Sequence, residues 1–293
     1  MQSDQVILQV SKKGAEMMSI VNKESGREFL WQGDPTHWKF RSPILFPIVG
    51  GVNGGTYRLD GKEYSMTNHG FARDYDWDLV KLTSSDVVFR LKAPEEKRAN
   101  YPFDFVLEIA YSVGRDVIKV AYKVVNPSDE TIYFQLGAHP GFNYKDFDAD
   151  ASIQGYYQFD DKAKGDKLSV SVSNKDGLIV KKRGSVTLAE EGVMPITKST
   201  FNNDALILEG SQTQSIALLD RNKEPYVRVK FDAPVVGMWS KGGNMYAPFA
   251  CIEPWYGRCD DANYSGDYKE KPWVQSLEAK GVFKTNMSIW IGR

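Results

Sequence analysis

Histidine is the side chain whose ordinary pKa lies nearest to neutral pH, and it often serves as a general acid or base. The sequence contains only three histidines in 293 residues. His37 lies in the polar segment 34–38, where a surface position is the simplest interpretation. His69 precedes a glycine, and His139 stands in the glycine- and proline-containing segment 137–143. Local sequence leaves two interpretations for His139: a proton-transfer or ligand-binding group, and a residue that only stabilises a turn.

A predicted strand indicates on which face of the sheet the His139 side chain lies. Apolar residues alternate over Ile132–Leu136, which is the pattern of a β-strand with one buried face. Continuing the alternation places His139 with Tyr133 and Gln135, on the face opposite the apolar residues. We therefore expect His139 to emerge among polar groups that hydrogen-bond a ligand.

A carboxylate with apolar neighbours lies in the segment 249–257. Strand alternation puts Glu253 on the same face as Phe249 and Cys251, which are residue types that are usually buried. Partial burial disfavours the charged carboxylate and raises its pKa toward values that suit a general base. The alternative interpretation is a surface glutamate before a proline turn. Aromatic side chains able to stack on a sugar ring are also present, namely Trp239, Trp255 and Tyr256.

The elements that must position these side chains are strands. Phe103–Tyr111 and Ile118–Val124 alternate apolar and polar residues, and the glycine-containing link between them predicts a hairpin. Similar segments recur at Val6–Val10, Met17–Val21, Val87–Leu91, Ala205–Leu208, Ile216–Leu219 and Val227–Phe231. Polar turn sequences such as 60–62 and 220–223 separate strands, and no segment shows a long amphipathic helical stripe. The expected fold class is all-β, a large antiparallel β-sandwich. The polar stretch 160–184 fits either a domain boundary or long solvated hairpins. We expect the hairpins, with residues 1–293 in one domain.

Composition narrows the class of protein. Lysine and arginine number 37 against 38 aspartates and glutamates, so the basic surface that binds nucleic-acid backbones is not expected. The two cysteines, Cys251 and Cys259, are too few for a disulfide framework. The first residues lack the pattern of a signal peptide, and no apolar run approaches the roughly 18 residues of a membrane-spanning helix. We expect a cytoplasmic protein with neither nucleic acid nor membrane as partner; the sequence does not indicate the oligomeric state.

Motifs for cofactor chemistry are not recognisable. The glycines in segment 50–55 lack the spacing of a dinucleotide-binding or phosphate-binding loop, and a hairpin-like segment follows them instead of a helix. Cys251 and Cys259 lack the paired spacing of a zinc site, although ligands that converge from distant segments stay an open alternative. The glycine–serine elbow of α/β-hydrolases is also missing. No cofactor and no metal are therefore predicted.

Five segments carry a combined signal. They extend over most of the chain and are Ser42–Gly50, Asn68–Asp74, Ala138–Asn143, Asp204–Leu208 and Cys251–Gly257. Together they resemble the aldose 1-epimerase (galactose mutarotase-like) family, and in particular its bacterial LacX-like branch. Each segment alone is a weak signal, whereas all five in the family's order are strongly specific.

The resemblance implies a fold, an activity and a set of roles. The fold is a β-supersandwich with a sugar site on an open concave face. The activity is interconversion of the α and β anomers of a hexose through the open-chain aldehyde, without a cofactor. Glu253 would be the general base that takes the anomeric hydroxyl proton, and His139 the general acid that protonates the ring oxygen. The small-molecule sugar would be bound by His69, Arg73, Asp204, Trp239 and Trp255.

Two alternatives and one departure accompany this expectation. A hexose-6-phosphate 1-epimerase is a related enzyme and would need cationic groups for the phosphate. A non-catalytic sugar-binding or regulatory protein on the same fold is the second alternative. In the LacX-like branch a basic residue often follows the segment that ends at Gly50, but here Gly51, Val52 and Asn53 occupy this stretch. The cationic side chains expected to compensate are Arg41, Arg73 and Lys241.

Overall fold

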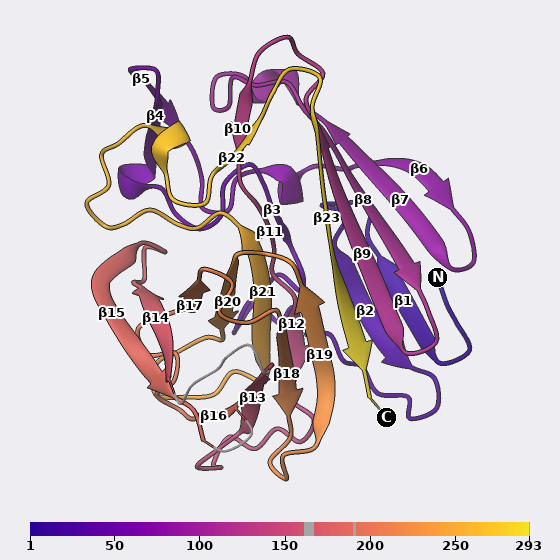
Figure 1. The fold of residues 1–293 in the computed structure, drawn as a ribbon. Helices are drawn as coiled ribbons and strands as arrows, with labels where there is room; N and C mark the ends of the chain where they lie inside the picture. Colours follow the sequence, from indigo (N-terminus) through magenta and orange to yellow (C-terminus); the bar gives the residue numbers. More distant parts are fainter. Residues whose placement is uncertain (161–166, 190–191, 293) are drawn as a thin grey trace.

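Antiparallel strands make up most of the molecule. The computed structural model describes residues 1–160, 167–189 and 192–292 (Figure 1). The helices of these residues are single 3-10 turns: η1 (Asn53–Gly55), η2 (Ala72–Asp74), η3 (Glu95–Lys97) and η5 (Tyr268–Glu270). The expected all-β class is therefore confirmed.

Two large sheets dominate the described part of the chain. The nine-stranded sheet has the order β16 (Val193–Ile196), β13 (Gly155–Phe159), β18 (Ser215–Leu219), β19 (Pro225–Phe231), β23 (Val282–Ile291), β9 (Val117–Val125), β8 (Val106–Val113), β7 (Asp86–Lys92) and β6 (Asp78–Leu82). The eight-stranded sheet has the order β15 (Ile179–Thr187), β14 (Lys167–Ser173), β17 (Leu206–Glu209), β20 (Val235–Trp239), β21 (Phe249–Tyr256), β11 (Leu136–Ala138) and β3 (Ile44–Leu45), and β12 (Gly141–Asn143) also pairs with β21.

Three two-stranded sheets complete the described strands. They are β1 (Val6–Val10) with β2 (Met17–Asn22), β4 (Thr56–Leu59) with β5 (Lys62–Ser65), and β10 (Ile132–Phe134) with β22 (Gln275–Leu277). The turn expected at 60–62 joins β4 to β5. The hairpins expected in 160–184 correspond to β14 and β15, whereas residues 161–166 lie outside the described residues.

The two large sheets share an apolar core. On β21, Ala250 and Ile252 join a cluster of buried side chains that includes Tyr157 and Ile289 of the nine-stranded sheet. The Tyr157 hydroxyl donates a hydrogen bond of 3.0 Å to the carbonyl of Cys251, across the two layers. The alternate residues of β21 are also buried, but on the opposite face. This second face of β21 carries the candidate site, so the sandwich core serves as its rigid support.

Two predicted strands differ from the structure by more than one or two residues or in their pairing. Ile132–Leu136 is not one strand, because β10 pairs with β22 whereas β11 pairs with β21 and β3. The break falls at Gln135, a buried residue whose amide bonds two backbone groups. The strand predicted from Phe103 begins at Val106. Alternation is a local pattern and does not reveal where a strand changes its partner.

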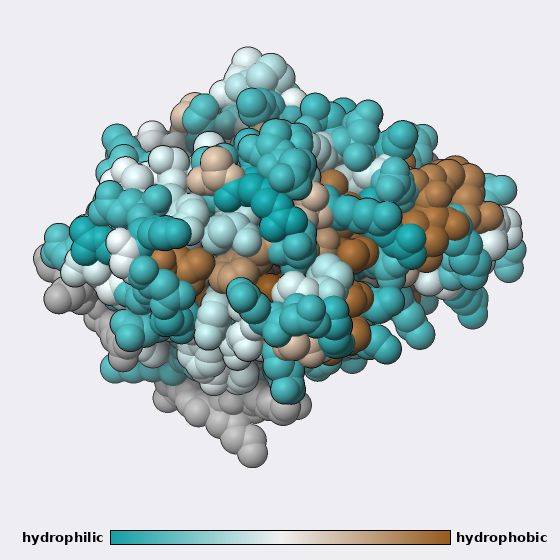
Figure 2. Space-filling view, turned by 90° about the horizontal axis from the view of Figure 1, so that it is seen from above, coloured by the Kyte–Doolittle hydropathy of each residue, from teal (hydrophilic) through white to brown (hydrophobic). Residues whose placement is uncertain are grey.

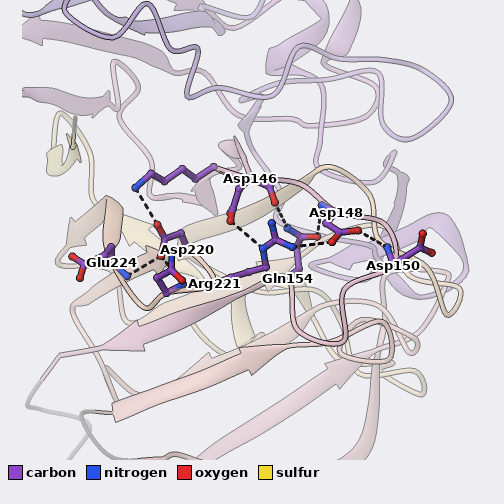
Figure 3. Close-up of polar contacts among 9 residues, drawn as sticks. Asp146, Asp148, Asp150, Gln154, Asp220, Arg221 and Glu224 are labelled. Atoms are coloured by element: carbon purple, nitrogen blue, oxygen red, sulfur yellow. Dashed lines mark hydrogen bonds and ion pairs between the residues drawn. The ribbon is translucent and has the colours of Figure 1, made fainter.

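The turn predicted at 220–223 joins β18 to β19 and is fixed to the connection between β12 and β13 (Figure 3). Arg221 donates from Nε to Asp146 over 3.0 Å and from Nη1 to Asp148 over 2.9 Å. Asp220 accepts the backbone N–H of Glu224 at 3.0 Å, which closes the turn. Partly exposed ion pairs of this kind contribute little, about 0–1 kcal/mol each.

One edge of the nine-stranded sheet is apolar. Strand β6 exposes Leu79, Val80 and Leu82, and its pairing with β7 shifts between Leu79 and Lys81. Figure 2 shows hydrophobic surface gathered at the right-hand end of the molecule, the side on which Figure 1 places β6 and β7. The bulge disturbs the edge hydrogen-bonding pattern and so opposes the addition of a further strand. None of the described helices is long and apolar enough to cross a membrane.

Candidate active site

The pairing of the strands brings His139 and Glu253 together. Gly137 of β11 pairs with Trp255 of β21, and Gly141 of β12 pairs with Cys251 of the same strand. His139 lies midway between the two glycines, and Glu253 lies midway between their partners, so the register sets the two residues opposite each other. Residues 114 positions apart in the sequence therefore become direct neighbours on the second face of β21.

The two functional groups are in contact and nearly inaccessible to solvent. Nε2 of His139 lies 3.2 Å from Oε2 of Glu253, and their side chains are 8% and 1% exposed. Neither oxygen of the Glu253 carboxyl nor Nδ1 of His139 has a well-formed hydrogen bond among the described residues, although the Trp255 side chain interacts with the carboxyl and acts to lower its pKa. Buried polar atoms are normally bonded, and groups that are not are typical of functional sites.

Burial shifts the pKa of both groups in opposite directions. Desolvation, followed by the charge of Asp204, raises the pKa of Glu253 well above its ordinary value of 4.5. Desolvation, followed by the charge of Arg73, lowers the pKa of His139 from 6.5 to about 3. Both shifts favour the uncharged form of each group. The neutral pair (carboxylic acid and imidazole) and the ion pair (carboxylate and imidazolium) hold the same number of protons. They differ only in which of the two groups carries the proton that is available for transfer.

His69, in the segment before η2, lies next to His139. The backbone N–H of Gly50 donates to Nδ1 of His69 over 3.0 Å, which leaves Nε2 as the protonated nitrogen of the neutral ring. The rings of His69 and His139 meet edge to face, with centroids 5.5 Å apart. Burial, His139 and Arg73 together hold the pKa of His69 well below 6.5. A neutral His69 therefore has its Nε2 proton available for a hydrogen bond to a ligand.

Asp204 and Trp239 form a hydrogen-bonded pair. Oδ1 of Asp204 accepts the indole N–H of Trp239 over 2.7 Å, and Oδ2 accepts the hydroxyl of Ser173, also over 2.7 Å. Burial raises the pKa of Asp204, and these two hydrogen bonds act in the opposite direction. The carboxylate therefore fixes the orientation of the Trp239 ring.

Arg73 is held in place next to these side chains by two contacts. Its Nη2 donates to the carbonyl of Asn68 over 2.9 Å, and its guanidinium carbon lies 4.5 Å from the centre of the Phe40 ring. Nε of Arg73 is buried without a hydrogen-bond partner among the described residues. Arg73 is thus a positioned cation with donor capacity to spare.

Aromatic rings surround His139. The indole of Trp38 stacks on the imidazole with centroids 4.6 Å apart and planes at 29°, and Trp239 meets it edge to face at 5.5 Å. Trp255 occupies a slot made by two glycines: a Cβ at Gly137 would lie 2.7 Å from its ring, and a Cβ at Gly237 2.5 Å. The small residues of the neighbouring strands are thus needed for the ring to lie flat on the sheet.

These side chains line one cavity of about 280 Å³, just below the roughly 300–1,000 Å³ range of small-molecule sites. All seven side chains that the sequence nominated line it: His69, Arg73, His139, Asp204, Trp239, Glu253 and Trp255. The suggestion that Tyr256 stacks on a ligand is wrong, because it points to the other face and contacts Phe283 and Thr285.

Other lining residues were not foreseen, among them Trp38, Phe40, Asn68, Ser173 and Lys175. Trp38 stands beside His37 in a loop, where sequence periodicity gives no direction. His37 itself is half-buried against Trp31, with centroids 5.9 Å apart. The only signal for Trp38 was the concentration of tryptophans in a loop. Lys175 comes from the turn between β14 and β15, and its place depends on a long-range contact.

That contact explains the departure at Gly51. The backbone N–H of Gly51 donates to the carbonyl of Gly177 over 3.2 Å, and a Cβ at this position would lie 2.8 Å from the carbonyl of Asp176. The β14–β15 turn thus fills the space that a side chain at position 51 would use, and it carries Lys175 to the cavity.

Of the three cations expected to compensate for Gly51, only Arg73 lines the cavity. Arg41 places Nη1 3.6 Å from Sδ of Met18. Lys241 donates from Nζ to the carbonyl of Thr36 over 2.8 Å. Neither belongs to the cavity lining, so that part of the expectation is wrong.

Comparisons with known proteins identify the family of the chain. The model of the aldose 1-epimerase family matches residues 1–263. The chromosomal LacX protein of Lactococcus lactis subsp. lactis is 26% identical over 299 residues, which cover 99% of this chain and 98% of LacX.

Solved structures of galactose mutarotase-like proteins have the same fold. A galactose mutarotase related enzyme from Lactobacillus acidophilus superposes with a TM-score of 0.90 at 29% identity, covering 100% of this chain and 96% of that chain. A galactose mutarotase-like protein from Lactobacillus casei gives a TM-score of 0.89 at 27% identity, covering 100% and 99%. The sandwich and its connections are thus shared over their whole lengths.

Proposed function

The chain belongs to the aldose 1-epimerase family, and from this premise we propose that it interconverts the α and β anomers of a hexose. One observation carries the proposal: His139 and Glu253 lie 3.2 Å apart in a cavity that also holds His69, Arg73 and Asp204. An acid and a base that serve one small reacting centre must both lie within hydrogen-bond reach of it, roughly 2.6–3.2 Å.

The proton transfers balance without a cofactor. Glu253 takes the proton of the anomeric hydroxyl while His139 gives a proton to the ring oxygen, so that the bond between C1 and the ring oxygen breaks and a C1 carbonyl forms. The pair starts as carboxylate and imidazolium and ends as carboxylic acid and neutral imidazole. Rotation about the C1–C2 bond and ring closure on the other face return both protons. Burial of both groups favours the neutral pair, which is the product of the opening step.

The remaining side chains bind and orient the sugar. His69 donates from Nε2, and the spare lone pairs of Asp204 accept hydroxyl protons while its bonds to Trp239 and Ser173 persist. Trp239 and Trp255 offer aromatic surface to the apolar face of the ring. This division of labour leaves His139 and Glu253 free for proton transfer.

A neutral hexose is the leading substrate, and a hexose 6-phosphate is the second candidate. The observation that favours the second is Lys175, a cation that lines the cavity together with Arg73. The remaining alternative is a non-catalytic sugar-binding or regulatory protein. It would leave both unbonded oxygens of Glu253 without a chemical role.

Polarimetry on freshly dissolved α-glucose, α-galactose and α-glucose 6-phosphate tests the proposal. We expect the purified protein to accelerate the approach to anomeric equilibrium for at least one neutral sugar. Acceleration with the phosphate alone would move the assignment to the second candidate. Binding in a calorimetric titration without acceleration of any of these sugars would replace both by the regulatory alternative.

The cytoplasm is the compartment that we propose for this activity. Both cysteines, Cys251 and Cys259, are unpaired and buried. Free thiols are maintained in a reducing compartment, which is the reason for this assignment.

A further inference from the structure

Three side chains that can ligate a metal ion, a thiol, an imidazole and a carboxyl, lie together at the cavity that His139 and Glu253 line. Cys251 lies two residues before Glu253 on the same face of β21, and His139 lies opposite them. One thiol, one imidazole and one carboxylate donor atom from these residues all lie within 4.8 Å of one another. The relative exposures of the three residues are 0% for Cys251, 1% for Glu253 and 6% for His139.

Buried polar atoms without well-formed hydrogen bonds in this three-residue cluster indicate a ligand-binding site. Neither carboxyl oxygen of Glu253 has a well-formed hydrogen bond among the described residues, although the Trp255 side chain interacts with this carboxyl. Cys251 has no part in the proton transfers, which need only the imidazole and the carboxylate. Its position beside them therefore adds a donor that the epimerase reaction does not require.

The donor set matches zinc in both chemistry and size. Thiolate and imidazole favour Zn²⁺ and its soft relatives over Mg²⁺ and Ca²⁺, which prefer oxygen ligands. With bonds of about 2.0–2.3 Å, the donors of a tetrahedral zinc site lie roughly 3.3–3.7 Å apart. The separation of 3.2 Å between His139 and Glu253 is just below this range, and the thiol, within 4.8 Å of both, has to move by about 1 Å.

We propose that His139, Cys251 and Glu253 form a zinc site whose occupation blocks the sugar reaction. Two of the three ligands, His139 and Glu253, line the cavity in which the sugar would bind. Zinc and sugar then compete, because the metal takes the lone pairs with which the two residues move protons. The metal is an inhibitor in this role and no cofactor. The inhibition rests on the proposed epimerase function, whereas the binding of zinc does not.

Cobalt(II) tests the site without an activity assay. A thiolate bound to Co²⁺ gives a charge-transfer absorption band in the near ultraviolet, and we expect this band when CoCl₂ is added to the wild-type protein. It should vanish in Cys251→Ala and persist in Cys259→Ala, which removes the other buried thiol. Calorimetry with ZnCl₂ should show one site per chain, and MgCl₂ should give no binding heat.

Two results would overturn the site itself: no cobalt band in the wild type, or an undiminished band in Cys251→Ala. Cys251→Ser gives the same test with an almost isosteric side chain, should the alanine variant fail to fold. The uncharged serine hydroxyl does not replace a thiolate as a soft-metal ligand. We also expect binding to strengthen as the pH rises, because zinc binds the thiolate and must displace the proton of the thiol.

Polarimetry then tests the inhibition. ZnCl₂ should slow anomer exchange by the wild type, a chelator should restore it, and more sugar should raise the zinc concentration needed. Relative to its own zinc-free rate, Cys251→Ala should need at least about 10-fold more zinc for half-inhibition, whereas Cys259→Ala should behave as the wild type. Equal zinc sensitivity of the wild type and Cys251→Ala would refute the inhibitory role. A cobalt band in a protein without epimerase activity would leave the metal site intact and refute only the proposed function.

Discussion

The indole of Trp38 lies flat on the imidazole of His139, with ring centroids 4.6 Å apart and planes at 29°. Trp38 is itself held from behind, because its carbonyl accepts the indole N–H of Trp31 over 2.7 Å. The stack fixes the plane of the His139 ring and covers one side of it. The face of an aromatic ring also attracts a cation, so Trp38 stabilises the imidazolium that donates the proton.

Replacing Trp38 should therefore slow the reaction without unfolding the protein. A cation–π contact contributes about 0.5–2 kcal/mol, so we expect Trp38→Leu to lower kcat by roughly 2- to 30-fold. Loss of the stack also lowers the pKa of the imidazolium further, which should change the acidic limb of the pH–rate profile. Trp290→Leu, in β23 of the other sheet, is the control and should keep both kcat and the profile. An unchanged profile in Trp38→Leu would show that the indole contributes only packing.

Asp204→Asn should weaken sugar binding more than it slows proton transfer. The substitution replaces the charged carboxylate whose oxygens accept hydrogen bonds from Trp239 and Ser173. Each hydrogen bond to a charged group contributes about 1.5–3 kcal/mol of stabilisation. We expect KM to rise by roughly 10- to 100-fold, with a smaller change in kcat. Steady-state polarimetry over a range of sugar concentrations separates the two parameters. A large fall in kcat at constant KM would instead assign Asp204 to the chemical step.

The buried pair should give the stability of the fold a maximum in weakly acidic solution. The folded pKa of Glu253 is raised, so its contribution is present below pH 4.5 and is lost as the pH rises. The folded pKa of His139 is lowered to about 3, so its contribution is present above pH 6.5 and is lost as the pH falls toward 3. Between pH 4.5 and 6.5 the two groups change the free energy of unfolding in opposite directions, each by about 1.4 kcal/mol per pH unit, so their effects nearly cancel.

Urea unfolding from pH 4 to pH 8 measures this maximum. Relative to the wild type, Glu253→Gln should lose the decline at higher pH, and His139→Asn should lose the decline at lower pH. We expect Glu253→Gln to be the more stable protein at pH 8, since it no longer buries an ionisable carboxyl. Parallel curves for the wild type and both variants would contradict the pKa shifts.

Gly51→Ala should destabilise the fold by about 1–3 kcal/mol, the usual cost of overpacking. The added methyl group meets the carbonyl of Asp176 at 2.8 Å, and backbone atoms do not move aside cheaply. Gly184→Ala in the neighbouring strand β15 is the matched control, because a Cβ there meets nothing within 4 Å. Thermal unfolding of the two variants gives the comparison. Equal stability would mean that the β14–β15 turn does not pack on Gly51 in solution.

Short-range patterns predicted the fold well, because a strand with one buried face shows its alternation within a few residues. Val6–Val10 is found with the predicted bounds, and Ile118–Val124 lies within β9. The break at Gln135 was missed, since a change of pairing partner depends on residues far away in the sequence. That residues 1–293 form one domain stays a prediction, which the core shared by both large sheets supports.

The site was predictable where a segment carried its own signal. Alternation placed Glu253 with Cys251 on one face, and the structure has them so. The register that sets His139 against Glu253 could not be derived, because three strands have to pair before the two residues meet. Trp38 and Lys175 lie in a loop and a turn, whose positions are set by packing rather than by periodicity.

In the proposed reaction, His139 and Glu253 move the two protons of anomer exchange. Exchange NMR or polarimetry on Glu253→Gln and His139→Asn, each with its folding checked by circular dichroism, tests it directly. Each positioned proton transfer contributes about 10²- to 10⁴-fold, so we expect a loss of at least about 100-fold in either variant. A folded variant that exchanges anomers at the wild-type rate would contradict it.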